Sequence, residues 1–281
     1  TNQAKKLCVI GDPVEHTKSP LIQNTMLQAL GLDYLYMAQY VPRGQAADWL
    51  QCAKLAGYAG FNATMPHKTD LIPLMDYLDE DARLYGAVNT VAIREGKAYG
   101  YNTDGKGFVR ALQKEGICLE GKRVTILGAG GAARAISVEC ALAGAASITV
   151  INRSQANGAE LTELINTHTP AKAQYLPWTP KIAVPECTDI LINGTCVGLH
   201  PNGHEKPDIN YDTITANMVV SDVVFNPVDP LFLQEARKRG AKTVSGIGML
   251  VQQGALNFTS WTGVEAPVDV MYKTLEAEFG A

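Results

Sequence analysis

A glycine-rich turn between a buried strand and a helix restricts the fold of this 281-residue chain more than any other feature. Residues 123–127 are predicted to form a buried strand and lead directly into Gly128-Ala-Gly-Gly-Ala-Ala133, which fits the pattern G-x-G-x-x-G/A, and residues 132–142 have helical spacing. Glycines permit a sharp turn and a close backbone approach, while the free N–H groups of a helix N-terminus attract a pyrophosphate. Alone the pattern also fits a plain tight turn. With a further strand at 148–151, it favours a dinucleotide-binding fold.

Strands and helices alternate along most of the chain, which predicts parallel sheets covered by helices on both faces. A helix is expected to begin with Ser19 as N-cap and Pro20 in its first turn. The last two helical stretches, 249–261 and 268–279, have no strand between them, so we expect them to return to the first domain. The sequence therefore predicts an α/β protein with two domains. They are an N-terminal α/β substrate domain, residues 1–105 and 247–281, and a Rossmann-type doubly wound dinucleotide-binding domain, residues 106–246.

The composition argues against several classes of partner. The chain is 46% hydrophobic and 19% charged, its net charge is −4, and it has no Lys/Arg run, which disfavours nucleic acid and anionic membrane surfaces. No stretch approaches the roughly 18 apolar residues of a membrane span. The first residues lead into a strand-like run and do not resemble a signal peptide, so we expect a cytoplasmic protein.

Cysteine and histidine residues are scattered. The six cysteines include no CxxC pair, and a Pro-Asn-Gly loop separates His200 from His204. We therefore expect buried reduced thiols and no metal site.

The end of the second strand of a dinucleotide fold indicates which cofactor is bound. NAD sites usually carry Asp or Glu there, to hold the ribose 2′-hydroxyl. This chain has Asn152, Arg153 and Ser154, beginning 24 residues after Gly128. Arg pairs with a 2′-phosphate that a carboxylate would repel, and short polar side chains add hydrogen bonds. The segment favours NADP over NAD, although an Arg153 that only stacks on adenine would serve either cofactor.

Polar side chains also stand at the expected strand ends of the first half. Asn62 opens a segment that ends in Lys68, Asn89 lies beside a strand, and Asp104 lies at the expected domain hinge. Ligands of α/β folds bind at the carboxyl ends of strands, so these side chains are expected to converge. Hydride transfer from an alcohol needs a proton acceptor, and a lysine positioned by a carboxylate can serve. Lys68 and Asp104 are the candidate pair; the alternatives are a solvated lysine and a helix N-cap.

Taken together and in order, these motifs resemble the shikimate/quinate dehydrogenase family. The resemblance covers almost the full chain. It rests on the following segments: Gly11-Asp-Pro-Val-Glu-His-Thr-Lys-Ser-Pro20, Asn62-Ala-Thr-Met-Pro-His-Lys68, Gly86-Ala-Val-Asn-Thr90, Asn102-Thr-Asp-Gly105, Gly128-Ala-Gly-Gly-Ala132, Asn152-Arg-Ser154, Asn193-Gly-Thr195 and Gly246-Ile-Gly-Met-Leu-Val-Gln-Gln253.

The resemblance implies reversible hydride transfer between 3-dehydroshikimate and shikimate with NADP(H), in a groove between two domains. Lys68 and Asp104 would be the catalytic dyad. Substrate would be held by Thr17, Ser19, Asn62, Thr64, Asn89 and Gln253. Cofactor would be held by Gly128, Gly130, Gly131, Ala132, Asn152, Arg153, Ser154, Thr195, Gly246 and Met249. The expected partners are small molecules, and both a monomer and a homodimer remain open.

Three departures from the family pattern bear on specificity. Thr17 stands where the family usually has the first Ser of Ser-x-Ser at the carboxylate site. Phe225 replaces a frequent Tyr whose hydroxyl meets the substrate, and Asn157 replaces a second Arg of many NADP-specific members. The alternatives are therefore a quinate/shikimate dehydrogenase that uses NAD or both cofactors, and a non-catalytic nucleotide-binding regulator. The intact Lys68 and Asp104 argue against the regulator. A folate-type dehydrogenase fits poorly, because Asn62 and the other hydroxyl-binding residues suit a polyhydroxylated ring.

Overall fold

The computed structural model describes residues 3–15 and 17–279. The chain divides into two compact units, one formed by residues 1–103 and 253–280 and the other by residues 104–252. Each unit is built around its own six-stranded sheet. The predicted fold class, two α/β parts with parallel sheet structure, is confirmed.

The sheet of the first unit has the order β2-β1-β3-β5-β6-β4. β1, β2 and β3 are parallel, whereas β5 pairs with β3 and β6 in antiparallel fashion. The strand bounds are β1 Lys5–Gly11, β2 Tyr34–Tyr40, β3 Tyr58–Ala63, β4 Tyr77–Leu78, β5 Thr90–Arg94 and β6 Lys97–Tyr101. Glu95 and Gly96, both with positive φ, form the two-residue turn between β5 and β6 that such a hairpin favours.

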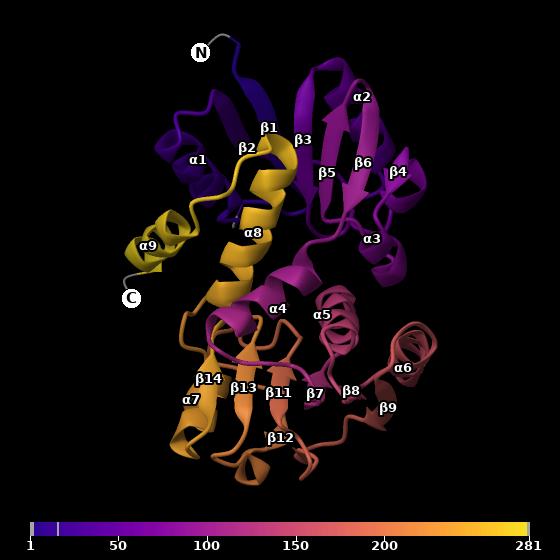
Figure 1. The fold of residues 1–281 in the computed structure, drawn as a ribbon, viewed down its shortest axis with the longest axis vertical. Coiled ribbons are helices and arrows are strands. Elements are labelled where there is room, and N and C mark those ends of the chain that lie inside the picture. The colour runs from indigo at the N-terminus through magenta and orange to yellow at the C-terminus, as the bar shows by residue number, and fades with distance from the viewer. Residues whose placement is uncertain (1–2, 16, 280–281) are drawn as a thin grey trace. The chain divides into compact units, whose positions relative to one another are not determined.

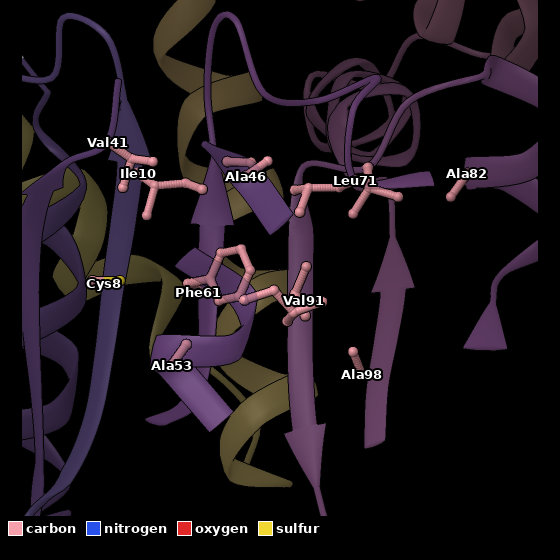
Figure 2. Packing of buried hydrophobic residues seen from close by; sticks show 13 residues of the cluster. Cys8, Ile10, Val41, Ala46, Ala53, Phe61, Leu71, Ala82, Val91 and Ala98 are labelled. Carbon is pink, nitrogen blue, oxygen red and sulfur yellow. The ribbon is translucent and has the colours of Figure 1, made fainter. Parts of the chain in front are cut away.

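Helices cover both faces of this sheet. α2 (Ala46–Leu55) packs its apolar side on one face, where Ala53 and Phe61 belong to one buried cluster (Figure 2). On the other face, α8 (Gly246–Thr262) contributes Trp261, whose Nε1 donates to the Val91 carbonyl at 2.9 Å; Figure 1 labels the helix. The remaining helices of the unit are α1 (Ser19–Ala29), which packs on α9 (Val268–Phe279), α3 (Glu80–Tyr85), and a 3-10 turn (Ile72–Leu74).

The second unit is a fully parallel sheet of order β14-β13-β11-β7-β8-β9. Its strands are β7 Arg123–Leu127, β8 Ser147–Asn152, β9 Lys172–Pro177, β11 Ile190–Asn193, β13 Val219–Asp222 and β14 Lys242–Val244. Numbered along the chain, the strands follow the doubly wound order 3-2-1-4-5-6, which places the topological switch point between β7 and β11.

The helices of the second unit connect these strands. They are α4 Asp104–Lys114, α5 Gly131–Leu142, α6 Gln155–His168 and α7 Leu231–Lys238. α4 lies beside α5 (Figure 1), because Gly105 leaves room for the Ala135 carbonyl, which a Cβ would approach to 2.5 Å. A small parallel pair, β10 (Ile182–Ala183) and β12 (Ile209–Asn210), and a 3-10 turn (Tyr211–Thr213) complete the unit.

Two expectations from the sequence need correction. Lys18, not Ser19, is the N-cap of α1 and makes no side-chain cap, so Ser19 is the first helical residue and is available for other bonds. Only Cys8 and Cys140 are buried thiols, whereas the other four cysteines are exposed.

Among the described residues, no helix is long and apolar enough to cross a membrane.

Candidate active site and cofactor site

The glycine turn after β7 leaves open space in front of a helix N-terminus. Gly128 has φ +103, a left-handed conformation that glycine adopts without strain. Gly130 is the N-cap of α5, and a Cβ built on Gly130 or Gly131 would meet no atom within 4 Å. Ala132 lies in the first helical turn. Backbone N–H groups with open space in front of them suit the pyrophosphate of a dinucleotide.

The polar segment after β8 is held by its own hydrogen bonds. Asn152 ends the strand, and its Nδ2 donates to the Ser154 carbonyl at 2.9 Å. Ser154 is the N-cap of α6, and its Oγ accepts from the Asn157 N–H at 3.3 Å. Arg153 is exposed between them. The segment therefore presents an exposed guanidinium and capping hydroxyl at the carboxyl edge of the sheet.

Three of the predicted cofactor residues line one cavity of about 380 Å³ in the second unit. Asn152 and Arg153 reach it from the end of β8, and Thr195 reaches it from the loop after β11. Trp178 and Lys206 also line it, from the segments after β9 and before β12. The sequence did not indicate either of these two residues, because both lie in irregular loops outside any motif.

Thr195 is fixed by a buried pair of side chains that the sequence also did not assign. Asn193 Oδ1 accepts from the Thr195 N–H at 3.1 Å and from its hydroxyl at 2.7 Å. Asn193 Nδ2 in turn donates to Asp222 Oδ1 at 2.9 Å, and the same oxygen accepts from the Val224 N–H at 2.9 Å. The end of β13 thus orients the loop that carries Thr195.

Asp222 is unusual because it is a carboxyl group with only 1% of its surface exposed. Its Oδ2 has no hydrogen-bond partner among the described residues. Burial raises the pKa of Asp222 to about 7, against the opposing effect of the Val224 and Asn193 hydrogen bonds. The side chain therefore changes its charge near neutral pH.

The predicted nicotinamide-end residues Gly246 and Met249 lie at the start of α8. A Cβ on Gly246 would lie 2.4 Å from the Val224 carbonyl, so only glycine allows this approach to the segment after Asp222. Met249 is half-buried one turn later. The segment after β13 therefore connects the start of α8 to the Asp222–Asn193–Thr195 chain of hydrogen bonds.

In the first unit, a buried polar network joins three of the predicted substrate residues. Asn62 Nδ2 donates to the Asn89 carbonyl and to Thr90 Oγ1, both at 3.0 Å. Asn89 Nδ2 donates to Thr103 Oγ1 at 3.0 Å. Gln253 joins the network through Asn257, whose Nδ2 donates to Gln253 Oε1 at 2.9 Å.

Asn257 is the centre of this network. Its Oδ1 accepts from the hydroxyls of Thr90 and Thr103, each at 2.7 Å. The side chain is 1% exposed. Sequence reasoning missed Asn257, which stands in an apolar stretch of a helix, but its spacing of four residues from Gln253 places both on one face of α8.

The other predicted substrate residues lie at the carboxyl ends of β1 and β3 and at the start of α1. Thr17 Oγ1 donates to Ser19 Oγ at 3.2 Å, and Tyr36 OH donates to Asn62 Oδ1 at 2.6 Å. Burial raises the pKa of Tyr36, and a hydrogen bond between the Ser19 and Tyr36 side chains opposes that shift. Thr64 follows β3, and its N–H donates to the Ile10 carbonyl. The hydroxyl of Tyr36 therefore links Ser19 to Asn62.

Lys68 and Thr103, the residue before Asp104, are each hydrogen-bonded to the loop that contains Val88 and Asn89. Lys68 lies in the turn after β3, and its carbonyl accepts from the Val88 N–H at 2.8 Å. The Thr103 N–H donates to Asn89 Oδ1 at 3.0 Å. Asp104 follows Thr103 directly, is 8% exposed and begins α4. Val88 and Asn89, which are consecutive in one loop, thus bind the backbone of Lys68 and of Thr103.

Replacement of Asn257 by leucine is expected to lower the free energy of unfolding by about 2–3 kcal/mol. Leucine matches the shape of asparagine but removes the acceptor that lies 2.7 Å from the hydroxyls of Thr90 and Thr103, so that both hydroxyls depend on Asn89 Oδ1 alone. Urea denaturation measures the change. Thr259→Ala, at an exposed position of the same helix, is the matched control and should change stability by less than about 0.5 kcal/mol. Equal losses in both variants would contradict a special role for the network.

The doubly wound sheet and the open glycine turn at its switch point define a Rossmann-type nucleotide-binding protein. Comparison with known proteins gives the family. The profile of the shikimate dehydrogenase substrate binding domain matches residues 9–91, and that of the shikimate 5'-dehydrogenase C-terminal domain matches residues 246–276. The chain belongs to the shikimate dehydrogenase family, which confirms the resemblance inferred from the motifs.

Several relatives match over nearly the full chain. A shikimate dehydrogenase (NADP(+)) of Methanopyrus kandleri is 44% identical over 266 residues, which are 94% of this chain and 92% of the relative. The structure of a 5-ketofructose reductase of Gluconobacter sp. strain CHM43 is 41% identical with a TM-score of 0.93, covering 99% of this chain and 100% of that one. A Listeria monocytogenes shikimate 5-dehydrogenase in complex with shikimate and NAD is 36% identical with a TM-score of 0.91, covering 98% and 97%.

Proposed function

We propose that this chain is an NADP-dependent shikimate dehydrogenase, which interconverts 3-dehydroshikimate and shikimate by reversible hydride transfer. The observation that supports this most directly is the buried network of Asn62, Asn89, Asn257 and Gln253. It holds amide groups beside Thr103, the residue before Asp104, which is a suitable arrangement for binding ring hydroxyls next to a proton acceptor. The relative from Methanopyrus kandleri carries the same activity in its name.

In this proposal, the unit containing residues 1–103 and 253–280 binds the substrate, and the unit 104–252 binds the dinucleotide. Thr17 and Ser19 hold the carboxylate, while Asn62, Thr64, Asn89 and Gln253 hold the ring hydroxyls. Gly128, Gly130, Gly131 and Ala132 hold the pyrophosphate, and Thr195, Gly246 and Met249 line the nicotinamide end. A cytoplasmic location fits an enzyme that draws on the NADP(H) pool.

The proposed chemistry needs one proton acceptor. A nicotinamide held at the end lined by Thr195, Gly246 and Met249 would supply the acceptor for the hydride of the carbinol carbon. Lys68 takes the hydroxyl proton in the same direction of reaction, and Asp104 positions the Lys68 amine. In the reverse direction Lys68 returns the proton to the carbonyl oxygen. The anchoring of Lys68 to Val88 and of Thr103 to Asn89 supports this assignment.

The preference for NADP rests on the end of β8. Arg153 is exposed at the cavity edge and suits a bidentate contact with a 2′-phosphate, and the Ser154 hydroxyl and Asn152 amide add hydrogen-bonding groups. Asp or Glu, the usual partners of an NAD ribose, are absent from this segment. Asn157 supplies no second positive charge there, so the proposed enzyme is expected to use NAD as well, with lower efficiency.

A second candidate function is reduction of a polyhydroxylated ketone that carries no carboxylate. The 41% identity with the 5-ketofructose reductase structure favours it, together with the departures at Thr17 and Phe225 from the usual substrate-contacting residues. Loss of a tyrosine hydroxyl removes one donor for an acidic substrate, and threonine adds a methyl group at the carboxylate site. A quinate-active dehydrogenase is the nearer alternative, since quinate retains the carboxylate.

A kinetic matrix decides between these functions. Shikimate, quinate and fructose are each oxidised by the purified chain with NADP and with NAD, and kcat/KM is measured for the six combinations. We expect the highest value for shikimate with NADP. A maximum for fructose would support the ketone reductase instead. No turnover in any combination would contradict both and favour a nucleotide-binding regulator.

A further inference from the structure

Lys206 shares a cavity with the residues proposed to select the cofactor. The cavity of about 380 Å³ that contains Asn152 and Arg153 is also lined by Lys206, from the loop before β12. The Lys206 side chain is 40% exposed, and it also lines the neighbouring cavity that contains Tyr211. We infer that Lys206 is a second cation for the 2′-phosphate of NADP and supplies the charge that Asn157 does not.

The position of the cavity supports this ligand group. The end of the second strand of a doubly wound sheet lies beside the adenosine ribose, where the 2′-hydroxyl or 2′-phosphate is recognised. Trp178 and Val197 give the cavity apolar surface that suits an adenine base. Arg153 and Lys206 line the same cavity in which this ribose would lie. This inference rests on the proposed use of NADP.

Lys206 determines whether the residues that line the cavity carry a net positive charge. Among its lining residues, Arg153 and Lys206 are cations and Asp208 is a carboxylate. With Lys206 the lining carries one excess positive charge, whereas without it the charges of Arg153 and Asp208 cancel. A dianionic phosphate would then find no net attraction. Lys206 therefore offsets Asp208 and leaves Arg153 to act on the phosphate.

The present contacts of Lys206 are weak enough to be exchanged for a phosphate. Its Nζ lies 3.7 Å from Glu235 Oε1, beyond hydrogen-bond range, and 4.7 Å from the centre of the Tyr211 ring. Glu235 is bound more closely by Lys238 at 2.8 Å and by Arg239 at 3.1 Å. A pair held at this distance by a 40% exposed lysine contributes little to stability, and Glu235 keeps two partners if Lys206 moves.

The test compares ligands that differ only in the 2′-phosphate. Calorimetric titration of 2′,5′-ADP and 5′-AMP is carried out on the full chain and on Lys206→Met, which keeps the length of the side chain without its charge. We expect the Kd for 2′,5′-ADP to rise about 5- to 20-fold, as for the loss of a charge-assisted contact, and the Kd for 5′-AMP to change less than about 2-fold. KM for NADP should rise in parallel, with kcat and the KM for NAD little changed.

Lys181→Met is the matched control. Lys181 lines the neighbouring cavity but not this one, and its loss removes the same charge from the same unit. It should leave both Kd values unchanged within about 2-fold. Equal weakening of 2′,5′-ADP by the two variants, equal weakening of both ligands by Lys206→Met, or no effect of Lys206→Met would each overturn the inference. Because binding is measured without turnover, absence of shikimate oxidation would refute the proposed reaction and leave the role of Lys206 intact.

Discussion

Replacement of Lys68 by alanine is expected to lower kcat by about 10² to 10⁴ while KM for shikimate changes much less. In the proposed mechanism the lysine takes a proton that moves only in the transition state, whereas the proposed contacts of the ring hydroxyls are amides of the buried network. Loss of such a group lowers the rate and leaves ground-state binding largely in place. Steady-state kinetics with NADP and shikimate measure the effect.

The control for this variant is Lys97→Ala, at an exposed strand position of the same unit. It should keep kcat within about 2-fold, as expected for a surface substitution. Circular dichroism spectra and binding of 2′,5′-ADP show whether Lys68→Ala retains its fold and its cofactor site. Wild-type kcat in a folded Lys68→Ala variant would contradict the proposed dyad, and so would a rise in KM alone.

The sequence was sufficient to predict the doubly wound sheet, but one of its strands was missed. β7 and β8 each contain four consecutive buried residues, mostly apolar, because they lie inside the sheet and are covered on both faces. β9 lies at the edge of the sheet, where exposed and partly buried residues alternate and a proline ends the strand. Its weak hydrophobic signal follows from that edge position.

The helix cap at α1 shows a different limit of sequence reasoning. Ser19 before Pro20 is a typical start signal, yet the helix begins at Ser19 itself. The Ser19 hydroxyl bonds with Thr17 and Tyr36 instead of capping the helix. Local propensity could not indicate this, because Tyr36 comes from a strand that folding brings beside it.

The sequence motifs indicated candidate site residues, but they did not indicate the hydrogen bonds that orient those residues. Asn62, Asn89 and Gln253 stand in recognisable motifs, whereas Asn257 lies in an apolar stretch of α8. Its role depends on Thr90 and Thr103, which are far from it in the chain. Asn257 becomes buried only when α8 packs on the first sheet, and the sequence pattern of the helix does not indicate that contact.

Asp222 gives a second large expected effect, on stability as a function of pH. Burial raises its pKa from an ordinary value of 3.8 to about 7 in the folded protein. Between these two values the unfolded chain has lost the proton that the folded chain keeps, so the free energy of unfolding falls as pH rises. The fall begins near pH 4, levels off above about pH 7, and amounts to about 4 kcal/mol in all.

Asp222→Asn is expected to remove this pH dependence. The asparagine oxygen can accept the Asn193 and Val224 hydrogen bonds as Asp222 Oδ1 does, and the side chain no longer ionises. The stability of the variant relative to the wild type should therefore rise by about 2–3 kcal/mol between pH 5 and pH 8. Urea unfolding at several pH values measures it, using the transition that NADP shifts, since ligand binding identifies the nucleotide-binding unit.

Asp189→Asn in the same unit is the matched control, with a shift of opposite sign. Arg123 lowers the pKa of Asp189 to about 2, mainly through their side-chain hydrogen bond. The stability that this pair contributes is present above the ordinary carboxyl pKa and is lost only as pH falls through about 2. Its removal should therefore give the same offset at pH 5 and pH 8. If Asp222→Asn also gave a constant offset, Asp222 would be ionised across that range, and its burial would not control the charge next to Asn193.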